Sequence, residues 1–188
     1  MSLGRGCDFV TGPDDERCEG GRKPSIQAPG VFDEVVFESF HAETFAPLWT
    51  FARRICRDES EAQDVCQQAY VAVYRYWKAG RLREDPRRLL YRVAQRGAID
   101  VVRARSRRQR LERAVAPPAV GGPWLGIEVR EALRAMKPED AALLLLQSAV
   151  GLSQEEMAGV TKQSLAAVRS RLYRARRQLA ALLEGRER

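Results

Sequence analysis

The sequence has few of the features that mark enzymes or membrane proteins. Its longest uninterrupted apolar run is Ala141–Leu146, far shorter than the roughly 20 residues that a membrane-spanning helix needs. The N-terminal residues lack the apolar core of a secretory signal peptide. The sequence also has no glycine-rich phosphate loop, no nucleophile elbow and no carboxylate pair in an apolar setting. We therefore expect no catalytic activity, no cofactor and no insertion into a membrane.

Cysteine and histidine are too few and too scattered for a metal site. The single histidine is His41, and none of the four cysteines is paired at the spacing of zinc ligands. Cys7 and Cys18 lie in a polar stretch, whereas Cys56 and Cys66 lie within helical patterns. Free or buried thiols are typical of a reducing compartment, so we expect a cytoplasmic protein without a bound metal.

The chain is basic and its charge is unevenly distributed. Its 188 residues carry 32 Lys and Arg against 25 Asp and Glu, a net charge of +7. Residues 31–110 hold sixteen basic and eleven acidic residues, whereas residues 1–30 hold four and five. A basic body favours a polyanionic partner, although charge alone does not separate DNA, RNA and anionic membrane.

The pattern of apolar and charged residues predicts an all-α protein with two small helical domains. Residues 1–30 are rich in glycine, proline and charge, which predicts a flexible tail. Helical periodicity fills residues 31–113, which we call the first module, and residues 127–188, the second module. Residues 114–126 between them are uncharged and rich in proline and glycine, which predicts a flexible linker.

Two helices are predicted at the start of the first module. The first begins near Asp33, and Pro47 should kink it or start a new helix. Ser60 with Gln63 predicts a capping box for the second, which Gly80 ends. Their apolar stripes are Phe37, Phe40, Leu48, Phe51 and Ile55, then Ala62, Val65, Cys66, Ala69, Tyr70, Val73 and Trp77.

A third helix of this module is rich in arginine. Asp85 followed by Pro86 is a typical helix start. The predicted helix, residues 86–110, contains nine arginines and a single acid, Asp100. Its apolar positions keep to one side and are needed for a core, so the basic side indicates a nucleic-acid surface rather than a membrane surface. Those apolar positions are Leu90, Val93, Ala94, Gly97 and Val101.

The second module ends in a predicted helix-turn-helix at residues 151–179. Ser153 and Glu156 form a capping box for the first helix, and Ser164 is a good N-cap for the second. The second helix has an apolar stripe of Val168, Leu172, Ala175, Leu179 and Leu182, and off that stripe lie Arg169, Arg171, Arg174, Arg176 and Arg177. A helical hairpin with a solvated basic face is the alternative. The agreement of caps, turn and one-sided charge favours a helix that enters a DNA major groove.

With these motifs in place, the chain resembles bacterial sigma factors of the extracytoplasmic-function (ECF) group over about residues 33–184. In the first module the resemblance to the family's second conserved region is carried by residues 62–70 (AQDVCQQAY), 89–94 (LLYRVA) and 98–103. In the second module, residues 151–158 and 168–176 resemble the fourth conserved region. The chain departs from the family pattern at four positions. The family usually has tryptophan in place of Leu89 and asparagine in place of Arg96, and apolar residues in place of Thr161 and Gln163. These departures concern promoter sequence and strand separation.

The resemblance implies a protein that binds core RNA polymerase, brings it to promoters and helps to separate the DNA strands. One face of the second helix would contact the polymerase: Asp64, Gln67, Gln68, Val71 and Arg75. The arginine helix would bind the single-stranded −10 element through Arg88, Tyr91, Arg92, Arg96 and Arg103, although Tyr91 can equally be a core residue. The last helix would read the −35 element through Ser164, Ala166, Ala167, Arg169, Arg171 and Arg174.

The roles differ within the −35 set. We expect Arg169 and Arg174 to reach base edges or phosphates, and Ser164 and Arg171 to position the helix on phosphates. The small side chains of Ala166 and Ala167 would permit close approach to the groove. A stand-alone helix-turn-helix regulator is the main alternative function, and an enzyme of nucleic-acid chemistry is a distant third; co-purification with core polymerase separates the first two.

The sequence also raises an expectation about control. Neither module has a large acidic patch, so we expect that neither hides the DNA surface of the other. The acidic residues of the tail are few and mixed with basic ones, so self-inhibition by residues 1–30 should be weak. Control would then come from a separate anti-sigma factor, which ECF relatives commonly use, or from synthesis and breakdown.

Overall fold

The protein is described by a computed structural model that covers residues 32–111 and 126–185. These residues contain helices only: α1 (Glu34–Cys56), α2 (Glu59–Lys78), α3 (Pro86–Leu111), α4 (Ile127–Ala135), α5 (Pro138–Ser148), α6 (Gln154–Thr161) and α7 (Leu165–Glu184). The predicted all-α fold is confirmed. The predicted tail and most of the predicted linker lie outside the described residues. No helix of the described ranges is long and apolar enough to cross a membrane.

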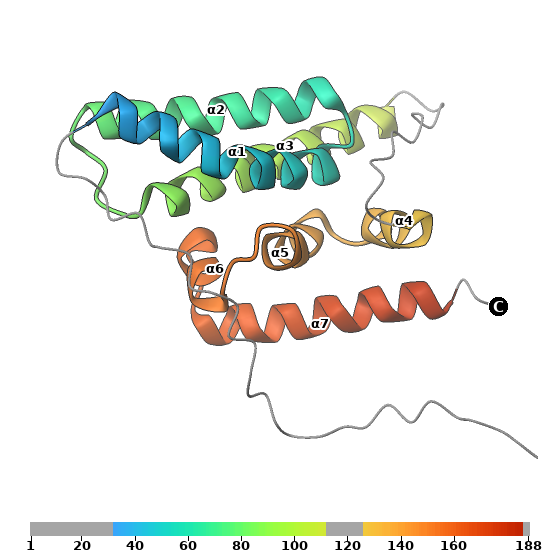
Figure 1. The fold of residues 1–188 in the computed structure, drawn as a ribbon. Coiled ribbons are helices and arrows are strands. Elements are labelled where there is room, and N and C mark those ends of the chain that lie inside the picture. Colours follow the sequence, from blue (N-terminus) through green and yellow to red (C-terminus); the bar gives the residue numbers. More distant parts are fainter. Residues whose placement is uncertain (1–31, 112–125, 186–188) are drawn as a thin grey trace, which may run out of the picture.

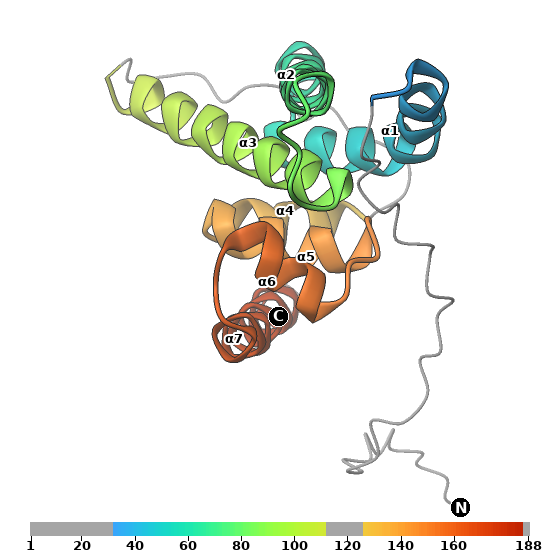
Figure 2. The ribbon, with the colours of Figure 1, turned by 90° about the vertical axis from the view of Figure 1, so that its left-hand side faces the viewer.

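Helix α1 begins where an aspartate caps it and bends in its middle. The Asp33 carboxylate accepts a hydrogen bond from the Val35 N–H at 2.9 Å. Pro47 lies inside this helix and supplies no N–H for the ladder. Figure 2 shows the two halves of α1 running in different directions. The expected kink is confirmed, and the helix continues through it.

The N-cap of helix α2 lies two residues before the predicted N-cap Ser60. Its N-cap is Asp58, whose carboxylate accepts from the Glu61 N–H at 2.9 Å. The predicted Ser60–Gln63 capping box is therefore wrong. Aspartate and serine are about equally good N-caps, and an ionised carboxylate also interacts favourably with the positive end of the helix. At the other end Gly80 has φ of +64°, a conformation that favours glycine, and ends the helix as predicted.

The first module is held together by its aromatic side chains. Trp77 is 1% exposed, and its ring lies 6.0–6.1 Å from the rings of Phe32, Phe37 and Phe40, in near-perpendicular pairs. Such pairs add roughly 0.5–1.5 kcal/mol each beyond area burial. All seven predicted stripe residues of α2 are buried, as are four of the five of α1, with Phe37 partly buried.

The helix boundaries of the second module follow its capping signals. Pro138 occupies the first turn of α5 after the break at Lys137. The Ser153 N–H donates to Glu156 at 2.7 Å, and the Glu156 N–H donates back to the Ser153 hydroxyl at 3.1 Å, which confirms the predicted capping box. Lys162, with φ of +56°, ends α6 and leads into the cap of α7. The helix-turn-helix therefore forms as predicted.

Removing this capping box should destabilise the protein measurably. We expect Ser153→Ala to lower the free energy of unfolding by about 1 kcal/mol, because the Glu156 N–H loses the hydroxyl that accepts its hydrogen bond. Urea denaturation followed by circular dichroism measures the change. Ser170→Ala is the matched control, since Ser170 is exposed in the middle of α7 and its side chain caps nothing. Equal midpoints for the two variants would contradict the role of the box.

The two modules pack directly against each other. Figures 1 and 2 show α1–α3 as one layer and α4–α7 as a second layer beside it. Helix α3 contacts α1 and α2 on one side and α5 and α6 on another, and α1 also contacts α5. Buried apolar side chains of both modules form one continuous cluster. Helix α3 therefore lies between the core of its own module and the second module.

Candidate nucleic-acid and polymerase interfaces

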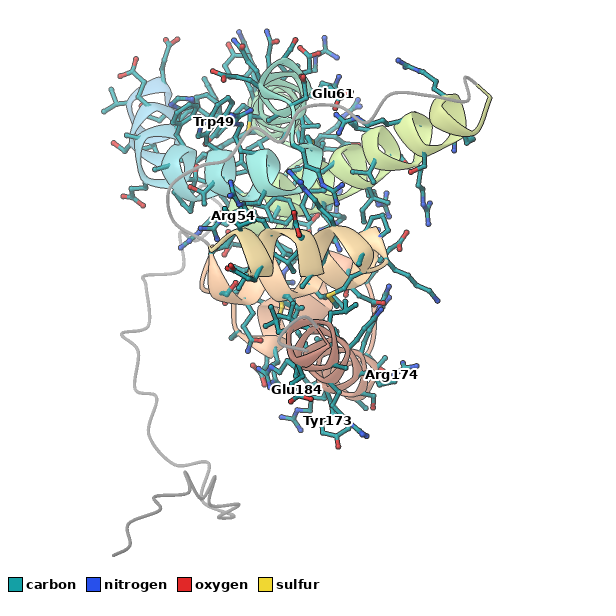
Figure 3. All side chains as sticks on the ribbon, turned by 90° about the vertical axis from the view of Figure 1, so that its right-hand side faces the viewer. Trp49, Arg54, Glu61, Tyr173, Arg174 and Glu184 are labelled. Atoms are coloured by element: carbon teal, nitrogen blue, oxygen red, sulfur yellow. The ribbon has the colours of Figure 1, made fainter. Side chains whose placement is uncertain are left out.

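The recognition helix α7 presents a basic surface to solvent. Its N-cap Ser164 accepts a hydrogen bond from the Ala167 N–H at 3.2 Å, so the serine hydroxyl retains its proton for a phosphate oxygen. Val168, Leu172 and Ala175 are buried against the module. Arg174 is exposed, and Figure 3 shows it projecting away from the other helices. This surface can approach a DNA groove without rearrangement of the module.

Some of the remaining −35 candidates have no side-chain partner, whereas others bond to neighbouring helices. Ala166 and Ala167 are exposed in the first turn of α7. The Arg169 side chain is 62% exposed, and its Nε donates to the Gln154 amide oxygen of α6 at 3.0 Å. The Arg171 side chain is only 27% exposed, and its Nε donates to Asp140 of α5 at 2.7 Å. Arg171 thus fastens α7 to α5, and a phosphate contact would have to share or replace this ion pair.

Two residues on the outward side of α7 were missed as site residues. Tyr173 is 61% exposed, and the Arg177 guanidinium lies 5.9 Å from the centre of its ring. Positions 170, 173, 174 and 177 are three or four residues apart, so they share one face of the helix. The same spacing can be read from the sequence, so Tyr173 and Arg177 could have been placed on this face without the structure. An exposed tyrosine on a basic helix face supplies an apolar contact for a thymine methyl group or a deoxyribose.

The predicted polymerase face of α2 is fully accessible. Its members, Asp64, Gln67, Gln68, Val71 and Arg75, are all exposed on the side opposite the buried stripe. Val71 is 40% exposed and lies among polar neighbours. One exposed apolar side chain is ordinary on a protein surface, so it is the accessibility of the whole face that makes it available to a partner. In Figure 1, α2 lies on the side of the first module away from α4–α7.

The −10 candidates of α3 are mostly engaged within the protein. The Tyr91 side chain is 0% exposed, and burial raises its pKa to about 12 while nearby Arg87 opposes the rise. Arg92, with a side chain 11% exposed, forms an ion pair with Glu84. The Arg103 Nη2 atom lies 2.5 Å from the Glu139 carboxylate at the start of α5. Arg88 and Arg96 are exposed, and the described residues give neither of them an ion pair with an acidic side chain.

Arg88, the fifth −10 candidate, crosses α6 at a glycine. A Cβ atom at Gly159 would lie 2.5 Å from the Arg88 Nε and 2.8 Å from its Cδ. Glycine within a helix costs about 1 kcal/mol relative to alanine. Here it leaves room for the arginine of the other module.

The expectation that neither module hides the DNA surface of the other stays a prediction, since the modules are in contact but Arg88, Arg96 and Arg103 remain exposed. It rested on the absence of a large acidic patch, but the contact needs none. Arg103 forms an ion pair with the Glu139 carboxylate, and Arg88 packs against Gly159. Apolar side chains supply the rest of the contact. In this arrangement Tyr91 is buried and offers no ring face to a base.

The described residues contain no group of three or more His, Cys, Asp or Glu that could hold a metal ion. Cys56 and Cys66 are free and buried. Burial raises the pKa of the Cys56 thiol to about 12 and that of the Cys66 thiol to about 11. Both side chains are thus protonated and unreactive at neutral pH.

Comparison with known proteins matches both modules. Residues 43–108 match the family model of sigma-70 region 2, and residues 127–179 match that of sigma-70 region 4. The two regions in this order are those of a two-domain protein of the sigma-70 type. The chain is 27% identical over 162 residues to the ECF RNA polymerase sigma factor SigE of Mycolicibacterium smegmatis. The aligned region covers 79% of this chain and 60% of that protein. The chain belongs to the sigma-70 family, within its ECF group.

Solved structures share this fold. The structure of CnrH in complex with the cytosolic domain of CnrY matches with a TM-score of 0.61 and 27% identity, over 81% of this chain and 90% of that chain. The sigma factor RpoE in complex with the anti-sigma factor NepR from Bartonella quintana matches with a TM-score of 0.59, over 78% of this chain and 98% of that chain. At 20% identity the second likeness concerns the fold alone. The chain spans about 60% of the length of its curated relative SigE.

Proposed function

We propose that this protein is an initiation factor that binds core RNA polymerase in the cytoplasm and directs it to promoters. The observation that carries the proposal is the presence of two accessible surfaces on one chain. The exposed face of α2 suits a protein partner, and the outward face of α7 suits duplex DNA. Within the family these modules belong to one factor, which supports a joint role for the two surfaces.

The proposed mechanism assigns a task to each surface. Polar and apolar contacts along α2, centred on Val71, hold the polymerase. Arg169 and Arg174 of α7 contact the −35 element in the duplex, where guanidinium groups reach guanine edges and phosphates. The arginines of α3 bind the backbone of the separated −10 strand, and Tyr91 stacks on a base once it is accessible.

The proposal includes an anti-sigma factor as a partner. Both solved relatives are complexes with a second protein, the cytosolic domain of CnrY in one case and the anti-sigma factor NepR in the other. A protein that covers the α2 face would block polymerase binding here. In vitro transcription with purified core polymerase on a genomic promoter library tests the function as a whole. Promoter-specific transcripts that depend on the added chain are expected, and their absence would contradict the proposal.

Changes on the α2 face should weaken assembly with core polymerase. We expect Asp64→Ala and Gln67→Ala to reduce the ability of the chain to compete with a reference sigma factor for core polymerase by roughly three- to tenfold. Each removes an exposed polar contact without disturbing the buried stripe. Glu184→Ala is the charge-matched control for Asp64→Ala, since Glu184 is exposed at the end of α7. If all three variants compete like the parent, the polymerase contacts lie elsewhere.

A further inference from the structure

We infer, on the basis of the proposed −35 role of α7, that Gln154 is a positioning residue that holds the Arg169 guanidinium in place for the DNA groove. Gln154 acts through Arg169 and not by a DNA contact of its own. It is the first residue of α6, whereas Arg169 lies in the second turn of α7. The contact therefore joins the two helices of the helix-turn-helix and fixes the reading side chain relative to the whole motif.

A hydrogen bond connects the two side chains. The Arg169 Nε donates to the Gln154 amide oxygen at 3.0 Å. A guanidinium only donates, so the oxygen of the amide is the atom that faces it. The Glu155 carboxylate lies 4.0 Å from the Arg169 Nη2, too far for a hydrogen bond. Both Nη groups thus stay available for a base edge or a phosphate, and the Arg169 side chain is 62% exposed.

Gln154 is itself held by the cap of α6. It follows Ser153 directly, and the Ser153 hydroxyl accepts from the Glu156 N–H at 3.1 Å. The Glu156 carboxylate accepts in return from the Ser153 N–H at 2.7 Å. This capping box orders the backbone of the first turn, from which the Gln154 side chain extends. An acceptor on an ordered turn restricts the arginine more than an acceptor on a loop does.

The uncharged amide suits an arginine that has to bind DNA. Arg171 gives the contrast, because its Nε donates to the Asp140 carboxylate at 2.7 Å and its charge is paired. Gln154 orders Arg169 without pairing its charge, and it adds no negative charge that DNA phosphates would repel. An arginine that is already ordered loses less side-chain entropy on binding. The hydrogen bond should therefore make recognition by Arg169 tighter.

The second proposed reading residue of α7 has no such support. The Arg174 Nε donates to the Ser170 carbonyl of its own helix at 3.4 Å, and no side chain in the described part of the chain bonds to it. A change at Gln154 should therefore alter recognition by Arg169 and leave recognition by Arg174 as it is.

The test replaces Gln154 with methionine, which keeps the length of the side chain and removes the acceptor. Gln147→Met is the matched control. Gln147 of α5 accepts from the Arg176 Nη2 at 2.8 Å, and Arg176 lies outside the proposed recognition face. Both substitutions are made in the full-length chain. Circular dichroism and thermal unfolding establish that each variant is folded.

The first readout needs no DNA. NMR relaxation of the arginine Nε–H groups reports how ordered each guanidinium is in the free chain. We expect the Arg169 Nε–H to be ordered in the parent and in the Gln147→Met control, and mobile in Gln154→Met. A mobile Arg169 in the parent would overturn the inference, as would an Arg169 that stays equally ordered in Gln154→Met.

The second readout is sequence preference in a pool of short duplexes with a randomised segment. The chain binds the pool together with core polymerase, and the duplexes are sequenced before and after selection. We expect Gln154→Met to weaken binding of the preferred sequences by roughly two- to tenfold, the cost of ordering one long side chain. The salt slope, which counts phosphate contacts, should not change. Gln147→Met should bind like the parent, and the same behaviour of Gln154→Met would contradict the positioning role.

A double-mutant cycle separates positioning from direct contact. In an Arg169→Ala background Gln154→Met should have no further effect, whereas in an Arg174→Ala background it should have its full effect. An equal loss in the Arg169→Ala background would mean that Gln154 touches DNA itself, and the inference would be wrong. If the parent selects no sequence, the proposed function fails, whereas the NMR data judge the Gln154 contact separately.

Discussion

Replacing Arg169 and Arg174 with alanine is expected to abolish selective binding of the −35 element. Each change removes an exposed cationic donor from the recognition helix. A guanidinium that reads a base edge contributes about 1–3 kcal/mol, so each single variant should lose roughly 5- to 150-fold in affinity for its promoter. The double variant should approach the affinity for non-specific DNA.

The salt dependence of binding separates the two kinds of contact. An arginine that reads a base should lower affinity for the cognate duplex only. An arginine that contacts a phosphate should lower affinity for all duplexes and reduce the salt slope by about one. Arg176→Ala is the matched control from the same helix, because Arg176 donates to Gln147 of α5 at 2.8 Å. If Arg176→Ala is as damaging as Arg174→Ala, the recognition face of α7 has been assigned to the wrong side.

Replacing Trp77 with alanine is expected to destabilise the first module by about 3–5 kcal/mol. The side chain is 1% exposed and contacts three aromatic rings, so its removal leaves a large cavity that rigid rings cannot fill. A small domain has a total stability of about 5–15 kcal/mol. Much of the module should therefore be unfolded at physiological temperature, and polymerase binding should fall with it.

Thermal unfolding followed by circular dichroism measures this loss, and polymerase binding is measured on the same samples. Tyr76→Ala is the control, because Tyr76 is the adjacent residue and is 52% exposed. Its substitution should change stability by less than about 0.5 kcal/mol. A small effect of Trp77→Ala would mean that the aromatic cluster is not what holds α1 to α2.

Local sequence signals predicted the helices and both outward surfaces. The capping box of Ser153 and the N-cap of Ser164 depend on neighbouring backbone atoms only, so their spacing identifies them. The one failed cap, at Ser60, was displaced by Asp58, another good cap two residues earlier. The exposed faces of α2 and α7 followed from the 3.6-residue period, because each helix buries one stripe and exposes the opposite side.

The role of α3 was decided by tertiary structure. Periodicity identified the stripe of Leu90 and Ala94, which packs within the first module, but Tyr91 is equally buried. A second contact by α5 and α6 involves residues far apart in the sequence, and no local pattern shows it. Charge did not predict this contact either, since a single carboxylate, Glu139, pairs with Arg103 and Arg88 lies against Gly159. The sequence by itself determined which helices form and which surfaces are basic. Only the packing of the two modules decided which of those surfaces is free, because burial depends on what approaches from elsewhere in the chain.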